Sequence, residues 1–237
     1  MLRKGLRAIG RQLAQLGYSN NELPSRVQLN LDFARANMSA SIYDQAVLEG
    51  VATSFPQTEE IINNGTVVGM STPDIQKVLN LKHAWEFVLD KDVLQSPSNL
   101  PVLCHIARIV NEGFFERGGR IRGVPVAIGG TSYTPPLPQE TIVAERIDAI
   151  VGGSGRPIDK SIALALYCMK AQVFLDRNKR ASIIFANHYL ISQGDGLLVV
   201  PEEKVPEFKD LLVAYYEDCS PKKTISFMKK ECWRSFK

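Results

Sequence analysis

The segment that decides the fold is 159-DKSIALALYCMKAQVFLDRNKRASIIFANHYLISQGDG-196. Asp159 can cap a helix that extends to about Val173, because a carboxylate at a helix start accepts free backbone N–H groups. A short polar break at 175–178 leads to a second helix, which Gly194 would end, as glycine commonly does. The second helix is apolar on nearly all sides, which predicts a central position in the fold.

Composition excludes several classes of protein. The 237 residues carry a net charge of +3, which is too small by itself to predict nucleic-acid binding. No stretch approaches the roughly 20 apolar residues of a membrane span, so an integral membrane protein is not expected. The 4 cysteines lie far apart, with no C-x-x-C pair. This spacing disfavours zinc ribbons and disulfide scaffolds and favours a reducing, cytoplasmic compartment, with delivery into another cell left open.

Outside the central segment the pattern is mainly helical, with one exception. Val124, Val126 and Ile128 alternate with small residues, a turn follows at Gly129–Gly130, and Pro135–Pro136 ends the segment. This pattern predicts a two-stranded hairpin, in which Pro125 indicates an edge strand. The fold class is therefore mainly α with a small β-hairpin. An exposed hairpin edge can accept a partner's extended segment, and a purely structural hairpin is the alternative.

Both ends of the chain are basic. Residues 1–20 place leucine and isoleucine at helical spacing among Arg and Lys, which predicts a basic amphipathic helix. Residues 221–237 contain six Lys or Arg and one acid, Glu231, and are expected to form a solvated tail or a last helix. Neither end predicts a function.

The polar break at 176–180 predicts an anion site. A polar loop that opens onto a buried helix presents backbone N–H groups without partners at the positive end of the helix dipole. Lys179 and Arg180 add positive charge, and Arg180 can bind a phosphate through two parallel hydrogen bonds. Asp176 could hold Mg²⁺ opposite the phosphates. The alternative is that Asp176 and Asn178 only cap the helix, with Lys179 and Arg180 in solvent.

The same segment resembles a known family. QVFLDRNKR, from Gln172 to Arg180, resembles the Fic-domain (Fido) signature H-P-F-x-D-G-N-(G/K)-R, and it is followed by small residues, an apolar helix and a glycine. The hairpin with its double proline resembles the Fic flap. VLEG, from Val47 to Gly50, resembles the end of the inhibitory motif (S/T)-x-x-x-E-(G/N) of that family. The three segments occur in the family's order.

The resemblance implies a helical bundle with a flap hairpin and an activity that transfers AMP from ATP to hydroxyl side chains of target proteins. A few members transfer other phosphate-containing groups, and members include toxins, secreted effectors and housekeeping regulators. It implies ATP, or another nucleotide, and Mg²⁺ as cofactors, with Asp176 on the metal. The phosphates would be bound by Arg177, Asn178, Lys179 and Arg180, and the target segment by Val124, Val126 and Ile128. The chain would divide into an N-terminal helical region at 1–98 that carries the inhibitory-type motif, a Fic core at 99–219, and a basic tail or helix at 220–237. Whether several copies of the chain associate is left open.

Departures from the signature make this a degenerate active site. Gln172 stands where the family has a histidine that acts as general base, and loss of such a base lowers rates by about a hundred- to ten-thousand-fold. Arg177 replaces a glycine and would be strained if its φ is positive. Ile183 replaces a second arginine, the family partner of the inhibitory glutamate, and Gln45 replaces the Ser/Thr of the inhibitory motif. Glu49 is therefore expected to lack its partner, and to be a packing or capping residue as readily as a regulatory switch.

Three hypotheses about function follow. The first is a nucleotide-binding protein with impaired transfer, whose nearest enzyme class is protein adenylyltransferase. The second is a non-enzymatic protein-interaction module on the same fold. The third is a transferase that uses another phosphate-containing donor or a base supplied by its ligand. The sequence leaves open whether the protein is an enzyme.

Overall fold

The computed structural model describes residues 25–218 and 220–236, and they form a mainly helical fold, as predicted. The basic helix predicted at the N-terminus lies outside the described residues. None of the described helices is both long and apolar enough to span a membrane. The elements before the flap region are α2 (Arg26–Ala36), α3 (Met38–Leu48), α4 (Phe55–Asn64), α5 (Thr72–Val88), α6 (Lys91–Gln95) and α7 (Leu100–Val110). Those after it are α8 (Glu140–Gly152), α9 (Pro157–Ala171), α10 (Asn178–Ser192), β1 (Leu197–Leu198), the 3-10 turn η1 (Glu202–Lys204), α11 (Val205–Asp218), α12 (Lys222–Phe227), the π-helical turn η2 (Met228–Cys232) and β2 (Trp233–Arg234).

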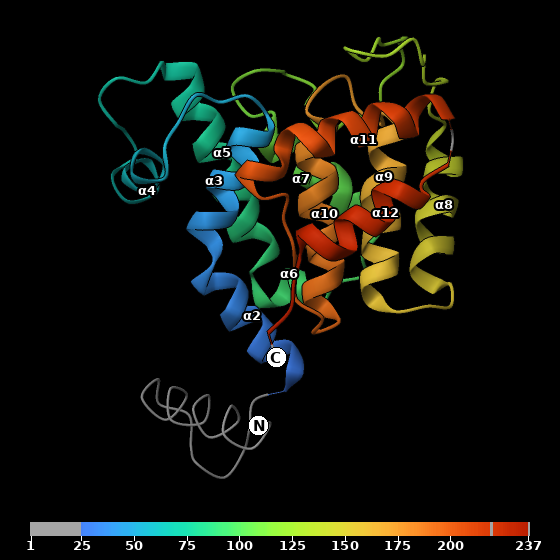
Figure 1. Ribbon diagram of the computed structural model, residues 1–237, viewed down its shortest axis with the longest axis horizontal. Coiled ribbons are helices and arrows are strands. Elements are labelled where there is room, and N and C mark those ends of the chain that lie inside the picture. Colours follow the sequence, from blue (N-terminus) through green and yellow to red (C-terminus); the bar gives the residue numbers. More distant parts are fainter. Residues whose placement is uncertain (1–24, 219, 237) are drawn as a thin grey trace.

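Helix α10 is the centre of the molecule, as its apolar sequence predicts. It contacts α9, α7, α5, α2 and β1, and it lies in the middle of the bundle in Figure 1. Two hydrophobic clusters share it. Ile184 and Phe185 pack with the helices from α2 to α8, whereas Ile183 and Leu190 pack with α9, α11 and the C-terminal turns. Because both faces are buried, the position of the N-terminus of α10 is fixed by the whole core.

The helix that precedes it begins two residues earlier than the predicted cap. Pro157 occupies the first turn of α9 and Arg156 is the residue before it, so Asp159 lies inside the first turn. Proline suits that position because its missing N–H would have no partner there. At the other end, α9 stops at Ala171 and Gln172 adopts a left-handed conformation.

The two-stranded antiparallel sheet joins β1 to β2, with Leu197 opposite Arg234 and Leu198 opposite Trp233. The prediction of strands at 124–131 is wrong: residues 121–139, here named the flap loop, form no strand. Pro125 has no N–H for a ladder, and an isolated hairpin is marginal in water. The backbone groups of the loop bond elsewhere instead. Arg122 donates to the carbonyl oxygens of Val124 and Pro136, and Ser132 N–H donates to Glu217.

His188 of α10 is buried and bonded through both ring nitrogens. Its Nε2 lies 2.8 Å from the carbonyl oxygen of Val93, which can only accept, so this nitrogen carries the proton. Its Nδ1 lies 2.8 Å from the Ser98 hydroxyl, which therefore donates. Burial lowers the pKa of His188 below its ordinary value, although the bond to Val93 opposes this shift. The imidazole is a structural link between α10 and the segment before α7.

We predict that the free energy of unfolding decreases as the pH falls from about 7 to 5. The unfolded chain protonates His188 at its ordinary pKa while the folded chain does not, and one such group contributes at most about 1.4 kcal/mol per pH unit. Urea unfolding at several pH values measures this slope. His188→Gln should flatten it, and the exposed His83→Gln is the control. Equal slopes for the wild-type chain and His188→Gln would contradict the assignment.

Candidate anion-binding site

The loop between α9 and α10 has a strained residue at each end. Gln172 has a φ of 44° and Arg177 a φ of 60°, and they are the non-glycine residues with positive φ in the described part of the chain. Such a conformation costs an L-residue roughly 1–2 kcal/mol. The resembling signature has glycine at the position of Arg177, so strain is expected there if φ is positive. The structure shows this positive φ. Strain of this kind concentrates at functional sites, where the surrounding structure holds it in place.

Asn178 closes this loop. Its Oδ1 accepts a hydrogen bond from Phe174 N at 2.9 Å, and its Nδ2 donates to Phe174 O at 2.8 Å. The same Nδ2 donates to Gln172 Oε1 at 3.0 Å, and Gln172 Nε2 donates to Met169 O at 2.7 Å. Phe174 is buried in the core. Both polar atoms of the Gln172 amide are thus used to hold the loop, and none is directed at a reacting group.

The N-terminus of α10 is uncapped. No side chain caps it, and the first bond of the helix runs from Ala181 N to Arg177 O at 3.1 Å. The N–H groups of residues 178–180 have no acceptor within the helix, by the geometry of an α-helix. Arg180 is buried, with a side chain 7% exposed, and the Lys179 side chain is 35% exposed. The alternative of simple caps with solvated cations is therefore wrong for the caps and for Arg180, whereas Lys179 is partly exposed to solvent.

Glu49 has partners, contrary to the expectation drawn from Ile183. It follows the end of α3, and its Oε2 lies 3.3 Å from Arg180 Nε while its Oε1 lies 3.9 Å from Lys179 Nζ. Arg180, in the first turn of α10, contacts the Glu49 carboxylate. In the resembling signature this contact is expected from a second arginine, at the position of Ile183. Gln45 of α3 holds the same turn, because its Nε2 donates to Arg180 O at 3.0 Å.

Two arginines in this cluster have unpaired donors. The Arg177 guanidinium lies 3.8 Å from the ring centre of Phe114, and Arg177 itself is 7% exposed. Nε and Nη1 of both Arg177 and Arg180 are buried and have no hydrogen-bond partner, and Oε1 of Glu49 has none either. Most buried polar groups in proteins are satisfied, so the four guanidinium nitrogens indicate a place where an anion fits, whereas the Glu49 oxygen is itself an acceptor.

A cavity of about 370 Å³ opens beside this cluster, between the flap loop, the α9–α10 loop and α11. It brings together five residues predicted from the sequence: Val126, Ile128, Gln172, Asp176 and Lys179. Val124 is not in its lining and is 52% exposed. The buried predicted residues Arg177, Asn178, Arg180 and Glu49 are not in the lining either, so they lie behind the cavity wall. Residues of α11 complete the wall and were not predicted: Lys209, Leu212, Val213 and Tyr216. Burial, with smaller contributions from Tyr215 and Glu49, raises the pKa of Tyr216 well above its usual value.

Arg122 anchors the flap loop to this site. It is buried, and its Nε donates to Gln172 O at 2.6 Å while its Nη1 donates to Val124 O at 2.8 Å. Its Nη2 donates to Pro135 O at 3.2 Å and to Pro136 O at 2.6 Å. Burial lowers the pKa of Arg122 below its ordinary value. One side chain therefore holds both ends of the flap loop against the end of α9, and no local sequence pattern indicates this role.

The residues fit Mg²⁺ bound together with a phosphate. The Asp176 side chain is 55% exposed at the cavity, and its Oδ1 accepts from Arg177 N at 2.6 Å. The described residues contain no group of three or more metal-ligating side chains, which disfavours a site made by protein ligands alone. Mg²⁺ commonly binds one or two carboxylates plus phosphate oxygens, and the uncapped N–H groups and unpaired guanidinium donors suit those phosphates.

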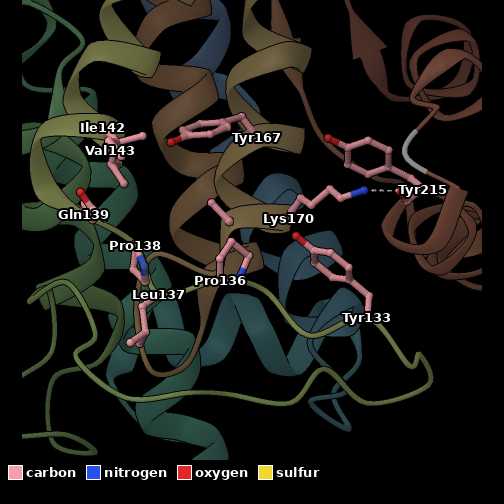
Figure 2. A pocket seen from close by; sticks show the side chains of 11 residues that line it. Tyr133, Pro136, Leu137, Pro138, Gln139, Ile142, Val143, Tyr167, Lys170 and Tyr215 are labelled. Carbon is pink, nitrogen blue, oxygen red and sulfur yellow. Dashed lines mark hydrogen bonds between the residues drawn. The ribbon is translucent and has the colours of Figure 1, made fainter.

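A second cavity, of about 450 Å³, lies between the C-terminal part of the flap loop and helices α8, α9 and α11 (Figure 2). Its walls combine tyrosine and proline rings, from Tyr133, Pro136, Tyr167 and Tyr215 among others, with aliphatic side chains such as Ile142. Lys170 Nζ donates to Tyr215 O at 2.9 Å and lies 4.9 Å from the ring centre of Tyr133. Its lining does not include the charged residues of the α9–α10 loop, so the anion site and this apolar cavity are separate.

Comparison with known proteins identifies the fold. The chain superimposes on a Fic domain containing signaling protein from Bacteroides thetaiotaomicron with a TM-score of 0.70 and 15% identity, over 96% of this chain and 90% of that one. Fic-1 of C. elegans gives 0.66 and 19%, over 97% and 68% of the two chains. A Fic family protein from Desulfovibrio desulfuricans gives 0.68 and 17%, over 96% and 69%. No family model and no curated protein matches the sequence. The predicted Fic-type helical fold is confirmed.

We predict that Glu49→Gln lowers the free energy of unfolding by about 3 kcal/mol in phosphate-free buffer, because it removes the buried carboxylate that faces Arg180. Inorganic phosphate in the buffer should restore part of this loss by supplying the missing anion. Urea unfolding with and without phosphate tests both statements, with the exposed Glu59→Gln on α4 as control. A variant as stable as the wild-type chain without phosphate would show that Glu49 does not balance the cluster.

Proposed function

We propose that this Fic-fold protein binds a nucleotide through its phosphates at the α9–α10 loop, together with Mg²⁺. The proposed class of activity is transfer of AMP from ATP to hydroxyl side chains of target proteins, which the resemblance to the Fic signature implies, with this chain's own transfer impaired by Gln172. The observation that carries the proposal is the uncapped N-terminus of α10, where buried guanidinium nitrogens of Arg177 and Arg180 form no hydrogen bond.

The cavity has room for such a ligand and polar groups in suitable places. Phosphates at the N–H groups of residues 178–180 would lie within reach of Arg180, and Lys179 and Lys209 add positive charge at the cavity wall. Asp176 would hold Mg²⁺, which neutralises phosphate charge when bound. Leu212 and Val213 of α11 give an apolar wall that suits a nucleobase.

The flap loop is the proposed site for a target segment. Val126 and Ile128 line the same cavity as Asp176, so an extended segment along this loop would bring a hydroxyl close to the phosphates. Arg122 keeps the ends of the loop in place for this contact. The loop lacks a strand, so the target is proposed to contact side chains and free backbone groups rather than to extend a sheet.

Transfer requires removal of the proton from the attacking hydroxyl, and Gln172 cannot accept it. An amide has no protonation equilibrium near neutral pH, and both polar atoms of this one are bonded within the loop. His188 is buried away against Val93 and Ser98. The lining of the cavity contains no histidine among the described residues.

Glu49 is the proposed regulatory residue. Its carboxylate lies 3.3 Å from Arg180 Nε, so it competes with a phosphate for the same guanidinium. A ligand that binds Arg180 must compensate for the loss of this contact. Glu49 thereby lowers the affinity of the site for anions.

A second candidate function, a protein-interaction module without transfer, is favoured by exposed apolar side chains around the loop. Leu175 is 47% exposed, Val124 52% and Phe115 43%. Such residues can contact a protein whether or not a nucleotide is present. A measurement of nucleotide binding distinguishes the two functions, because an interaction module does not require a bound nucleotide.

We predict that the chain binds Mg-ATP and that Arg180→Ala weakens this binding by about 10- to 100-fold, the effect expected for loss of a charged hydrogen-bond pair. Isothermal titration calorimetry gives both affinities. Arg146→Ala, on the exposed face of α8, is the matched control. No heat with any nucleoside triphosphate would refute nucleotide binding and favour the interaction module.

We predict that Gln172→His increases transfer of labelled AMP to protein by about a hundredfold or more, because it supplies the missing base. Histidine is tolerated at positive φ better than most residues, so the loop should keep its shape. Labelling of the variant alone and with a cell lysate measures the gain, and adding Asp176→Ala should abolish it. A variant that binds Mg-ATP but stays without labelling would show that the base is not the limiting defect.

A further inference from the structure

We propose that Arg177 is a second anion-binding residue, which with Arg180 forms a clamp of two guanidinium groups that selects ligands carrying a diphosphate over ligands carrying a single phosphate. This inference rests on the proposed function, because both concern the same site. It concerns a residue that stands where the resembling signature has glycine.

The first support is the balance of buried charge. The side chains of Arg177 and Arg180 are 6% and 7% exposed, and the Glu49 side chain beside them is 8% exposed. Asp176 is the next carboxylate, but its side chain is 55% exposed and its Oδ2 lies 3.8 Å from Arg177 Nε. Two buried cations therefore face one buried anion. Buried charge is expensive unless it is paired and hydrogen-bonded, so the cluster lacks one anion.

The second support is the set of donors without acceptors. Each guanidinium has its Nε and Nη1 buried and unbonded. These two nitrogens lie on different edges of the guanidinium plane, so each would donate to a separate oxygen. The two guanidinium groups therefore call for several acceptor oxygens at adjacent positions. A diphosphate supplies them, whereas a monophosphate can satisfy one guanidinium and leaves the other unpaired.

The third support is the mutual influence of the two side chains. Arg177 precedes the first residue of α10 and Arg180 lies three residues later, about one turn along, with both side chains buried. Like charges at this spacing in a poorly hydrated place repel each other. An anion bound between them would remove this repulsion, and a ligand of higher negative charge would do so more completely.

The fourth support is the cost of placing arginine at this position. A φ of 60° disfavours any residue with a Cβ, and glycine would avoid the strain. The ring of Phe114, 3.8 Å from the guanidinium carbon, holds the side chain flat in the cluster. A residue that destabilises the free protein is expected where binding of a ligand offsets that destabilisation.

The experiment compares inorganic pyrophosphate with inorganic phosphate by isothermal titration of the full chain. The main variant is Arg177→Asn, since asparagine tolerates positive φ but has no charge. We expect the wild-type chain to prefer pyrophosphate, and Arg177→Asn to lose about 10- to 100-fold in pyrophosphate affinity but less than about threefold in phosphate affinity. Arg177→Lys, which keeps the charge without the planar donors, should fall between them. Arg146→Ala is the control.

A melting curve without ligand adds an independent readout. Arg177→Gly should melt at the same temperature as the wild-type chain or higher, because it relieves the strained φ and the unpaired charge. If Arg177→Asn does not fold, Arg177→Gly replaces it in the titrations. A purely structural role would lower the melting temperature of the variants and leave the ratio of the two affinities unchanged, and this result would overturn the proposal.

The failure of this inference can be told apart from the failure of the proposed function. An unchanged or higher pyrophosphate preference in Arg177→Asn, with binding still lost in Arg180→Ala, would reject the role of Arg177 alone. If pyrophosphate and Mg-ATP bind to neither the wild-type chain nor any variant, both proposals fail.

Discussion

The candidate site depends on an imbalance of charge that the core holds at the N-terminus of one buried helix. Arg177 and Arg180 are buried with unpaired donors, and Glu49 is the carboxylate buried beside them. An isolated loop could not hold such a cluster, because its charges would turn to solvent. Here α10 lies between two hydrophobic clusters, and Asn178 ties its first residue back to Phe174. The stability of the core thus compensates for a site that is unfavourable by itself.

Tertiary contacts also position the other parts of the site around the first turn of α10. Arg122 connects the flap loop to Gln172, and Gln45 connects α3 to the first turn of α10. Helix α11, from a segment far along the chain, supplies one wall of the cavity. Each of these contacts joins residues that are distant in sequence. The phosphate-binding groups, the flap loop and the apolar wall are therefore positioned relative to one another by tertiary packing, as a site for a nucleotide and a protein segment requires.

The sequence predicts the parts of this arrangement that are local. The apolar circumference of α10 and the polar break before it follow from residue type and spacing, and the structure has both. A positive φ at Arg177 is suggested by the glycine of the resembling signature, and the structure has it. The strands predicted at Val124 and Ile128 are absent because the alternation does not reveal that Arg122 and Glu217 take the loop's backbone groups. The partner of Glu49 was missed for a similar reason. The contact between Glu49 and Arg180 depends on how α3 packs against α10, and the sequence of neither segment by itself predicts that packing. The roles of Gln172, Asp176 and the flap loop, and the division of the chain at residues 98 and 219, remain predictions.

The central claim is that the first turn of α10 binds polyphosphate, and the most direct test observes that turn. Nuclear magnetic resonance of the labelled chain during titration with pyrophosphate follows every backbone amide and the arginine Nε–H groups separately. The account predicts that the largest shifts occur at the amides of Asn178, Lys179 and Arg180, and at the Nε–H groups of Arg177 and Arg180. Shifts spread over surface lysines, with this turn unchanged at saturating ligand, would contradict it.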